Sequence, residues 1–238
     1  MTKHSSRNKK ANIQNNIFVI SLGGSLLVPN DIDTAFISNF VSLMKRLTRK
    51  GFKFILIAGG GKLCRTYQSA AKALRTVSDV ELDAMGIATT KVNAELLRIA
   101  LGNLAQPAVY QEPQKIRWDA PIAVAGGWKP GRSTDDVSIH FAKANKISAV
   151  VNLSNIEKLY TADPKVYKNA KPIDSINWNG FIKTIGTKRI PGGNYPFDPV
   201  AAKSAKTLDI KVYVASGQNL TNLYDLLHQK PFQGTVIN

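Results

Sequence analysis

Three glycine-rich turns in this chain each follow a short run of apolar residues. They are Gly23-Gly24-Ser25 after residues 17–22, Gly59-Gly60-Gly61-Lys62 after 54–58, and Gly126-Gly127 with Pro130-Gly131 after 122–125. Glycine lets a backbone approach a ligand closely and turn its N–H groups outward. A helix that follows such a turn adds partial positive charge. One such turn alone would only connect a strand to a helix, but three along one edge of a parallel sheet predict a polyphosphate site.

Strand-like and helix-like apolar patterns alternate from Ile17 to the C-terminus. We expect strands at 17–22, 54–58, 121–125, 148–152 and 211–214, an edge strand at 234–237, and helices at 34–50, 62–74, 86–101, 136–145, 197–208 and 220–228. Between them, Asp163-Pro164 and Lys171-Pro172 bracket a loop or hairpin. This alternation predicts an α/β fold, a three-layer αβα sandwich with a central, mainly parallel sheet.

Composition limits the possible compartments and partners. Residues 1–16 are polar and basic, and we interpret them as a disordered tail that precedes a single domain at 17–238. The formal charge of +16 suits a phosphate-bearing partner (nucleic acid, anionic membrane or nucleotide), although it also serves solubility alone. Cys64 is the only cysteine, which excludes an internal disulfide and favours a reducing, cytoplasmic compartment. No apolar run is long enough to span a bilayer, so we expect no membrane association.

Side chains near the second and third turns suggest where an anion would bind. Lys62 and Arg65 lie three residues apart at a helix start, where cations oppose the helix dipole unless an anion compensates them. We favour Arg65 as functional and leave Lys62 open, because a solvated basic face is the alternative. The third turn, 126–135, combines glycines, hydroxyls, two cations and a carboxylate, whereas Thr134 or Asp135 alone would only cap a helix. Neither a Walker A nor a dinucleotide fingerprint occurs.

Taken together, these segments resemble the amino-acid kinase superfamily, and within it the archaeal-type UMP kinases. The resemblance runs from about Ile17 to the C-terminus and implies the amino-acid kinase-like fold, with an N-terminal lobe for UMP and a C-terminal lobe for ATP. It is carried in order by LGGSLLVP (22–29), AGGGKLCRTY (58–67), DAMGIATTKVNAELL (83–97), GGWKPGRSTDD (126–136), SNIEKLYTADPK (154–165), FDPVAAKSAKTLDIKVYV (197–214) and the terminal GTVI.

The resemblance implies roles for individual residues. ATP would be bound by Gly24, Ser25, Gly61, Arg65, Ser154, Tyr160 and Asp163. UMP would be bound by Gly60, Asp83, Trp128, Lys129, Pro130, Gly131, Arg132, Ser133 and Thr134. Catalysis would depend on Asp135, which organises the cations, and on Arg65, Lys62, Lys129 and Arg132. Mg²⁺ would be carried with ATP, and the family's habit implies a homo-oligomer, a hexamer.

The chain departs from the family's pattern at three places. Ser21 stands where many members carry a catalytic lysine, so we predict that Lys129 or Arg132 partly replaces that cation. Glu157-Lys158 stands where the family usually has Asp-Gly, and lysine adopts glycine's positive φ only at a cost, so we expect that turn to differ. Trp128 replaces a threonine and would place a bulky ring beside the pyrimidine pocket.

The implied reaction is ATP + UMP → ADP + UDP, in pyrimidine nucleotide biosynthesis. Its nucleophile is an ionised phosphate oxygen, so no general base is needed, and positioning and cations supply the catalysis. Three alternatives stay open: a nucleotide-binding regulatory or storage protein of the same fold with weak or no catalysis, a kinase for another phosphorylated small molecule, and a nucleic-acid binder using the basic tail. No basic motif interleaved with aromatic residues supports the last of these, so nucleic acid is not the expected partner.

Overall fold

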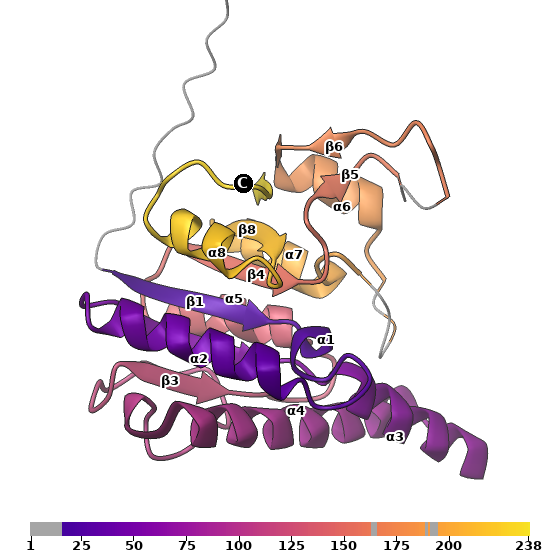
Figure 1. Cartoon of the computed structure of the whole chain (residues 1–238). Coiled ribbons are helices and arrows are strands. Elements are labelled where there is room, and N and C mark those ends of the chain that lie inside the picture. Colours follow the sequence, from indigo (N-terminus) through magenta and orange to yellow (C-terminus); the bar gives the residue numbers. More distant parts are fainter. Residues whose placement is uncertain (1–15, 163–165, 189, 191–194) are drawn as a thin grey trace, which may run out of the picture.

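A seven-stranded sheet runs through the molecule and carries helices on both faces (Figure 1). The computed structural model describes residues 16–162, 166–188, 190 and 195–238. Most of the expected tail and Asp163 therefore lie outside the described residues. The strands are β1 (Ile17–Leu22), β2 (Lys53–Ala58), β3 (Ile122–Ala125), β4 (Ala149–Ser154), β5 (Leu159–Tyr160), β6 (Pro172–Ile173), β7 (Ser175–Ile176), β8 (Lys211–Ser216) and β9 (Thr235–Ile237).

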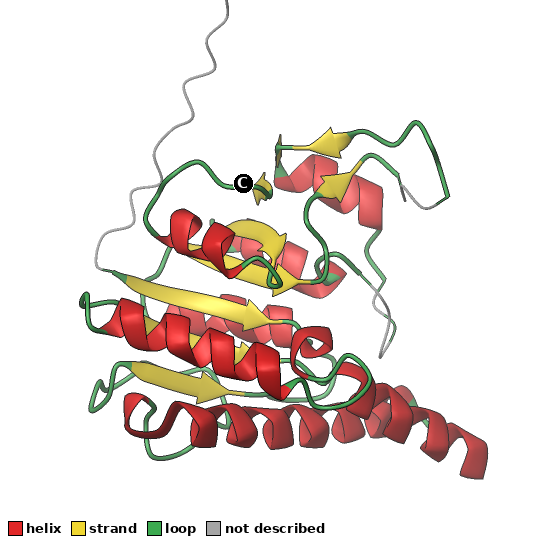
Figure 2. Ribbon diagram, in the orientation of Figure 1, coloured by secondary structure: helices red, strands yellow, loops and turns green. Residues whose placement is uncertain are grey.

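The helices fill the intervals between the strands (Figure 2). They are α1 (Gly24–Leu27), α2 (Thr34–Thr48), α3 (Gly61–Leu74), α4 (Asp79–Leu101), α5 (Thr134–Ala144), α6 (Trp178–Ile185), α7 (Pro199–Thr207) and α8 (Leu220–Leu227), with a short 3₁₀ turn at Gly102–Leu104. Among the described helices, none combines the length and apolar character that crossing a bilayer requires.

The order of the large sheet is β3-β2-β1-β4-β8-β9-β7, and its first five strands are parallel. β9 pairs antiparallel with β8 and parallel with β7, so the terminal strand is an inner strand and the prediction of an edge strand there was wrong. The β5 and β6 strands pair antiparallel as a separate hairpin. The expected αβα sandwich with a mainly parallel sheet is confirmed.

Alternating side chains of the strands build two separate cores. On β1, Phe18, Ile20 and Leu22 face α1, α2, α4 and α8, whereas Val19 faces the opposite layer of α5, α6 and α7. This alternation with period two follows from the pleat of a strand. Ser21 shares the α5 side with Val19, which brings its hydroxyl to the start of α5. Because both faces are covered, the strands read as continuous apolar runs.

Besides the four-residue α1, which was not predicted, two longer helices differ from expectation. Helix α4 begins at Asp79 and not at Gly86, because Ser78 and Glu81 form a reciprocal capping box that starts it earlier. Helix α6 was not predicted. Its sequence is short and contains Gly180, and it is held by an Asn177 cap and by the burial of Trp178 and Phe181. Packing against the core therefore decides this helix more than its local propensity.

Candidate active site

The glycine turns after β1 and β2 meet at the carboxyl edge of the sheet. A Cβ atom added at Gly24 would lie 2.0 Å from the backbone nitrogen of Gly61, so the two turns are in direct backbone contact. Gly61 adopts φ +63°, a conformation that favours glycine. From α4, the Asn93 amide donates to the carbonyl oxygens of Gly59 (2.8 Å) and Gly60 (3.2 Å). Sequence reasoning did not assign this supporting role to Asn93.

A pocket of about 250 Å³ opens on these turns. Its lining brings together many of the predicted residues: Gly24, Ser25, Gly60, Gly61, Arg65, Ser133, Thr134, Asp135 and Ser154. Asn152, Tyr195, Pro196 and Asp198 also line it, although sequence reasoning did not assign them to the site. Of these, Asp198 carried a recognisable signal, because an aspartate followed by proline is a typical helix start, and it caps α7 by accepting from Val200 and Ala201.

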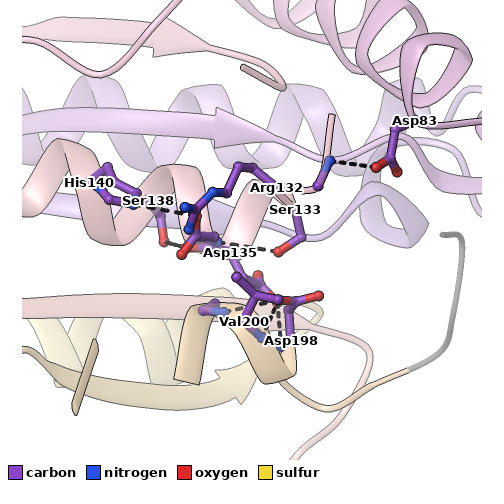
Figure 3. Close-up of polar contacts among 11 residues, drawn as sticks. Asp83, Arg132, Ser133, Asp135, Ser138, His140, Asp198 and Val200 are labelled. Carbon is purple, nitrogen blue, oxygen red and sulfur yellow. Dashed lines mark hydrogen bonds and ion pairs between the residues drawn. The ribbon is translucent and has the colours of Figure 1, made fainter. Parts of the chain in front are cut away.

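Asp135 lies in the first turn of α5, where its carboxylate is held by two other segments (Figure 3). Ser21 donates its hydroxyl hydrogen bond to Oδ1 at 2.9 Å, and the backbone nitrogen of Asp198 donates to Oδ2 at 3.1 Å. Burial, together with the nearby Asp198 carboxylate, raises the pKa of Asp135 to about 6. No lysine or arginine within the described ranges forms an ion pair with Asp135.

A second, smaller pocket of about 120 Å³ adjoins the first and shares Cys64, Ser133 and Thr134 with it. Asp83, Gly127 and Arg132 complete its functional lining. The turn from β3 to α5 is tied to α4 at two points. Gly127 N–H donates to the Thr90 hydroxyl at 2.7 Å. Gly131 N–H donates to the Asp83 carboxylate at 2.6 Å, a contact drawn in Figure 3. Two pockets thus share one wall at the third glycine turn.

The predicted cations take different places. Arg65 lines the first pocket, and Arg132 lines the second while pairing with Asp136 at 3.0 Å. Lys62 is exposed and lines neither pocket. The Lys129 ammonium lies 4.0 Å from the centre of the Trp128 ring. As placed, neither Lys129 nor Arg132 contacts Asp135, so the hydroxyl of Ser21 is the side-chain group that meets this carboxylate in the described structure.

Trp128 lies behind the second pocket and does not line it. Its ring packs edge-to-face on His140, with 5.6 Å between the ring centres, and adds to the core beneath α5. Pro130 and Gly131 are exposed, and Gly131 adopts φ +81° in the turn. In the described structure Trp128 is not among the residues that line the second pocket, and its place beside the pyrimidine stays a prediction.

The expected ATP-side segment follows β4. Ser154 lines the first pocket, and its hydroxyl accepts from the backbone nitrogen of Ile156 at 3.1 Å. Tyr160 lies in the β5–β6 hairpin, beyond the described lining of that pocket. The turn at Glu157-Lys158 has no positive φ, and Lys158 pairs with Asp174. The substitution of glycine by lysine is thus accommodated without left-handed backbone.

The fold is a three-layer αβα sandwich with a mainly parallel sheet, and its glycine turns, arginines and aspartates surround two adjoining pockets. These features define a phosphate-binding α/β protein. The family model described as "Amino acid kinase family" matches residues 16–216, and the chain belongs to that family.

Among its relatives, the uridylate kinase of Thermococcus kodakarensis is 33% identical over 224 residues, which cover 92% of this chain and 98% of the relative. The uridylate kinase of Methanocorpusculum labreanum is 33% identical over 223 residues, covering 92% of this chain and 94% of the relative. The crystal structure of uridylate kinase from Archaeoglobus fulgidus superposes with a TM-score of 0.75 at 28% identity, covering 94% of this chain and all of that chain (100%). The UMP kinase of Bacillus anthracis, at 19% identity and a TM-score of 0.74, is alike in fold, with 94% of this chain and 96% of that chain covered.

Proposed function

We propose that this protein is a UMP kinase that transfers the γ-phosphoryl group of ATP to UMP, giving ADP and UDP for pyrimidine nucleotide biosynthesis. The observation that carries the proposal is the pair of adjoining pockets, which share Cys64, Ser133 and Thr134. Each pocket has its own arginine, Arg65 in the first and Arg132 in the second. Two phosphorylated ligands bound there would meet at the shared wall.

The first pocket suits ATP and the second suits UMP. In this assignment Gly24, Ser25, Gly61, Arg65 and Ser154 bind the ATP phosphates, and Tyr160 and Asp163 bind the rest of the nucleotide. Asp83 accepts from the UMP ribose, and Gly60 with residues 128–134 encloses UMP from the turn side. We further propose an N-terminal lobe for UMP and a C-terminal lobe for ATP, with the turns at Gly24 and Gly61 reaching the ATP phosphates from the N-terminal lobe.

In the reaction, a phosphate oxygen of UMP attacks the γ-phosphorus of ATP, and the bond from that phosphorus to the bridging oxygen of ADP breaks. The attacking oxygen is already ionised, so catalysis consists of positioning and of stabilising negative charge. Arg65, Arg132 and the glycine N–H groups supply positive charge, with Lys62 and Lys129 as further cations able to reach a bound anion. Loss of one such donor costs on the order of a hundredfold in rate.

The donor set beside the first pocket fits Mg²⁺ that arrives with ATP. Asp135 and Asp198 provide carboxylate oxygens, the ligand type this ion prefers. Within the part of the chain that the structure describes, no three or more His, Cys, Asp or Glu side chains form a metal cage. Most ligands would therefore be ATP oxygens and water, and the ion would neutralise charge on the phosphates.

We also propose that the protein is a homo-oligomer in the cytoplasm, where ATP and UMP are available. The family's habit implies a hexamer, and the surface of α4 supports self-association. Apolar side chains recur there at helical spacing and are exposed: Val80, Ala84, Ala88, Val92 and Ile99. Exposed apolar stripes of this kind mark protein interfaces, and a second copy presents the same stripe to it.

The test is ADP release measured with ATP and UMP, CMP or AMP. We expect the turnover rate with UMP to exceed the rates with CMP and AMP by at least about tenfold. One well-placed set of contacts to the acceptor provides discrimination of that size. Turnover with none of the three would favour the regulatory or storage alternative, and preference for another acceptor would reassign the second pocket.

The Asp83→Asn variant tests the assignment of the pockets. It removes a charged hydrogen-bond acceptor, so the KM for UMP should rise about tenfold while the KM for ATP stays unchanged. Asp79→Asn, in the same helix but exposed, is the matched control. Equal changes in both KM values for Asp83→Asn would contradict the assignment.

A further inference from the structure

Three side chains spaced four residues apart run from the third glycine turn down one side of α5. Arg132 Nη1 lies 3.0 Å from Asp136 Oδ2, and His140 Nε2 lies 3.4 Å from the same oxygen. Residues four apart on a helix are neighbours on its surface. Figure 3 shows Arg132 and His140 on this side of α5. The carboxylate of Asp136 thus lies between the guanidinium of Arg132, a residue that lines the second pocket, and the imidazole of His140 one turn further along α5.

Asp136 is fully buried, and its other oxygen, Oδ1, accepts no hydrogen bond from the residues that the structure describes. A buried carboxylate is costly unless an opposite charge compensates it. The Arg132 guanidinium, with Nη1 at 3.0 Å from Oδ2, supplies that opposite charge. The most direct effect of Asp136 is therefore on the orientation of Arg132.

Asp136 lines neither pocket, so it can influence a bound ligand only through a neighbour. The Arg132 side chain is one-third exposed (33%) and reaches the second pocket. A long side chain in that position has many rotamers, and ordering it when a ligand binds costs conformational entropy. The ion pair with Asp136 orders the Arg132 side chain beforehand, so ligand binding no longer includes this cost. His140 Nε2 packs against this carboxylate at 3.4 Å without a hydrogen bond, and the Trp128 ring packs edge-to-face on the imidazole.

We propose that Asp136, braced by His140, is a positioning residue that holds the Arg132 guanidinium toward the acceptor phosphate. The inference rests on the proposed function, because the acceptor is the ligand of the second pocket.

The experiment compares Asp136→Asn, Arg132→Gln and the double variant in steady-state kinetics. We expect Asp136→Asn to raise the KM for UMP about tenfold, the size of one charged hydrogen bond, with the KM for ATP unchanged. In the Arg132→Gln background the same substitution should add less than twofold, because the group it positions is gone. Asp225→Asn, which breaks an ion pair on α8, is the control and should leave both KM values unchanged.

Several outcomes would overturn the proposal. The first is an Asp136→Asn variant whose KM for UMP stays within twofold of wild type. The second is an equal rise in the KM for UMP and the KM for ATP of that variant. The third is a rise in the KM for UMP that is just as large when Asp136→Asn is added to Arg132→Gln. If Asp136→Asn does not fold, His140→Gln carries the test through a rise of about threefold in the UMP KM, and no change would overturn the proposal. Absence of ADP release from wild-type protein with UMP would instead refute the proposed function, so the two failures are distinguishable.

Discussion

At the scale of single residues, the carboxylate of Asp135 is the most unusual group in the site. The family resemblance leads one to expect a lysine near it, but this chain has Ser21, whose hydroxyl donates a hydrogen bond and carries no charge. The neighbouring carboxylate of Asp198 adds repulsion. Burial of the carboxylate, followed by the Asp198 charge, raises the pKa of Asp135 to about 6, and the Ser21 hydrogen bond only partly offsets this rise. With no lysine beside it, the ionised carboxylate has affinity for a cation brought by the substrate.

The raised pKa predicts a specific pH dependence of stability. The ordinary pKa of an aspartate, 3.8, is raised to about 6 for Asp135 in the fold, so the protonated form favours folding. Its contribution to the free energy of unfolding is fully present below pH 3.8 and is lost as pH rises through about 6. Asp135→Asn does not titrate, so wild type should lose on the order of 2 kcal/mol relative to this variant between pH 4 and pH 7.5, allowing for partial exposure.

Thermal unfolding of both proteins in the same buffers measures this difference, and the other titrating groups cancel. A difference in Tm that stays flat across the range would contradict the raised pKa. Catalytic activity should depend on pH in the opposite direction from stability, since ionised Asp135 is needed beside the ATP phosphates. The rate of wild type should therefore fall as pH drops below about 6, and that of Asp135→Asn should be low throughout.

At the scale of elements, the site depends on two turns whose backbones touch. Gly24 and Gly61 leave no room for a side chain, because an added Cβ at Gly24 would lie 2.0 Å from a backbone nitrogen. The sequence predicted glycine turns after β1, β2 and β3, since each apolar run ended in consecutive glycines. It did not predict α1, which has only four residues, nor the support of the turns by Asn93, because both follow from contacts between distant segments.

Gly24→Ala should separate the two turns. We expect a fall in kcat/KM on the order of a hundredfold, because displacement of positioning groups by about 1 Å has that cost. Gly102→Ala is the matched control: its φ is +55° with no atom within 4 Å, so strain of about 1 kcal/mol is expected without loss of activity. Normal kinetics for Gly24→Ala would show that close contact of the turns is not required.

At the scale of the whole molecule, one long helix serves two surfaces. The inner face of α4 carries Asp83 to the second pocket and Asn93 to the glycine turn after β2, whereas its outer face exposes Val80, Val92 and Ile99. A helix that is apolar on its outer face as well as its inner one gives only a weak periodic signal. The exposed apolar stripe on which the proposed assembly rests is therefore recognised only once the structure shows which face of α4 the sheet covers.

Val92→Lys should dissociate the proposed homo-oligomer, because it puts a charge into the exposed apolar stripe of α4. Val92 is 60% exposed, so the folded monomer should tolerate the change. Light scattering coupled to gel filtration measures the mass of each species. Val166→Lys changes another exposed valine (67%) that lies outside the stripe and should leave the mass unchanged. A monomeric wild type, or an unchanged mass for Val92→Lys, would contradict this interface.

The sequence by itself determined the alternation of strands and helices, the three glycine turns and the family, because apolar periodicity and turn chemistry are local properties of the chain. It also identified Asp83, Arg65 and the turn at 126–135, which the fold gathers around two pockets. Only the tertiary structure decided that Asp198 joins Asp135, that Asp136 pairs with Arg132, and that β9 lies inside the sheet. The physical reason is that these relations are set by how separate elements pack, and the pattern of any one segment contains no record of its neighbours.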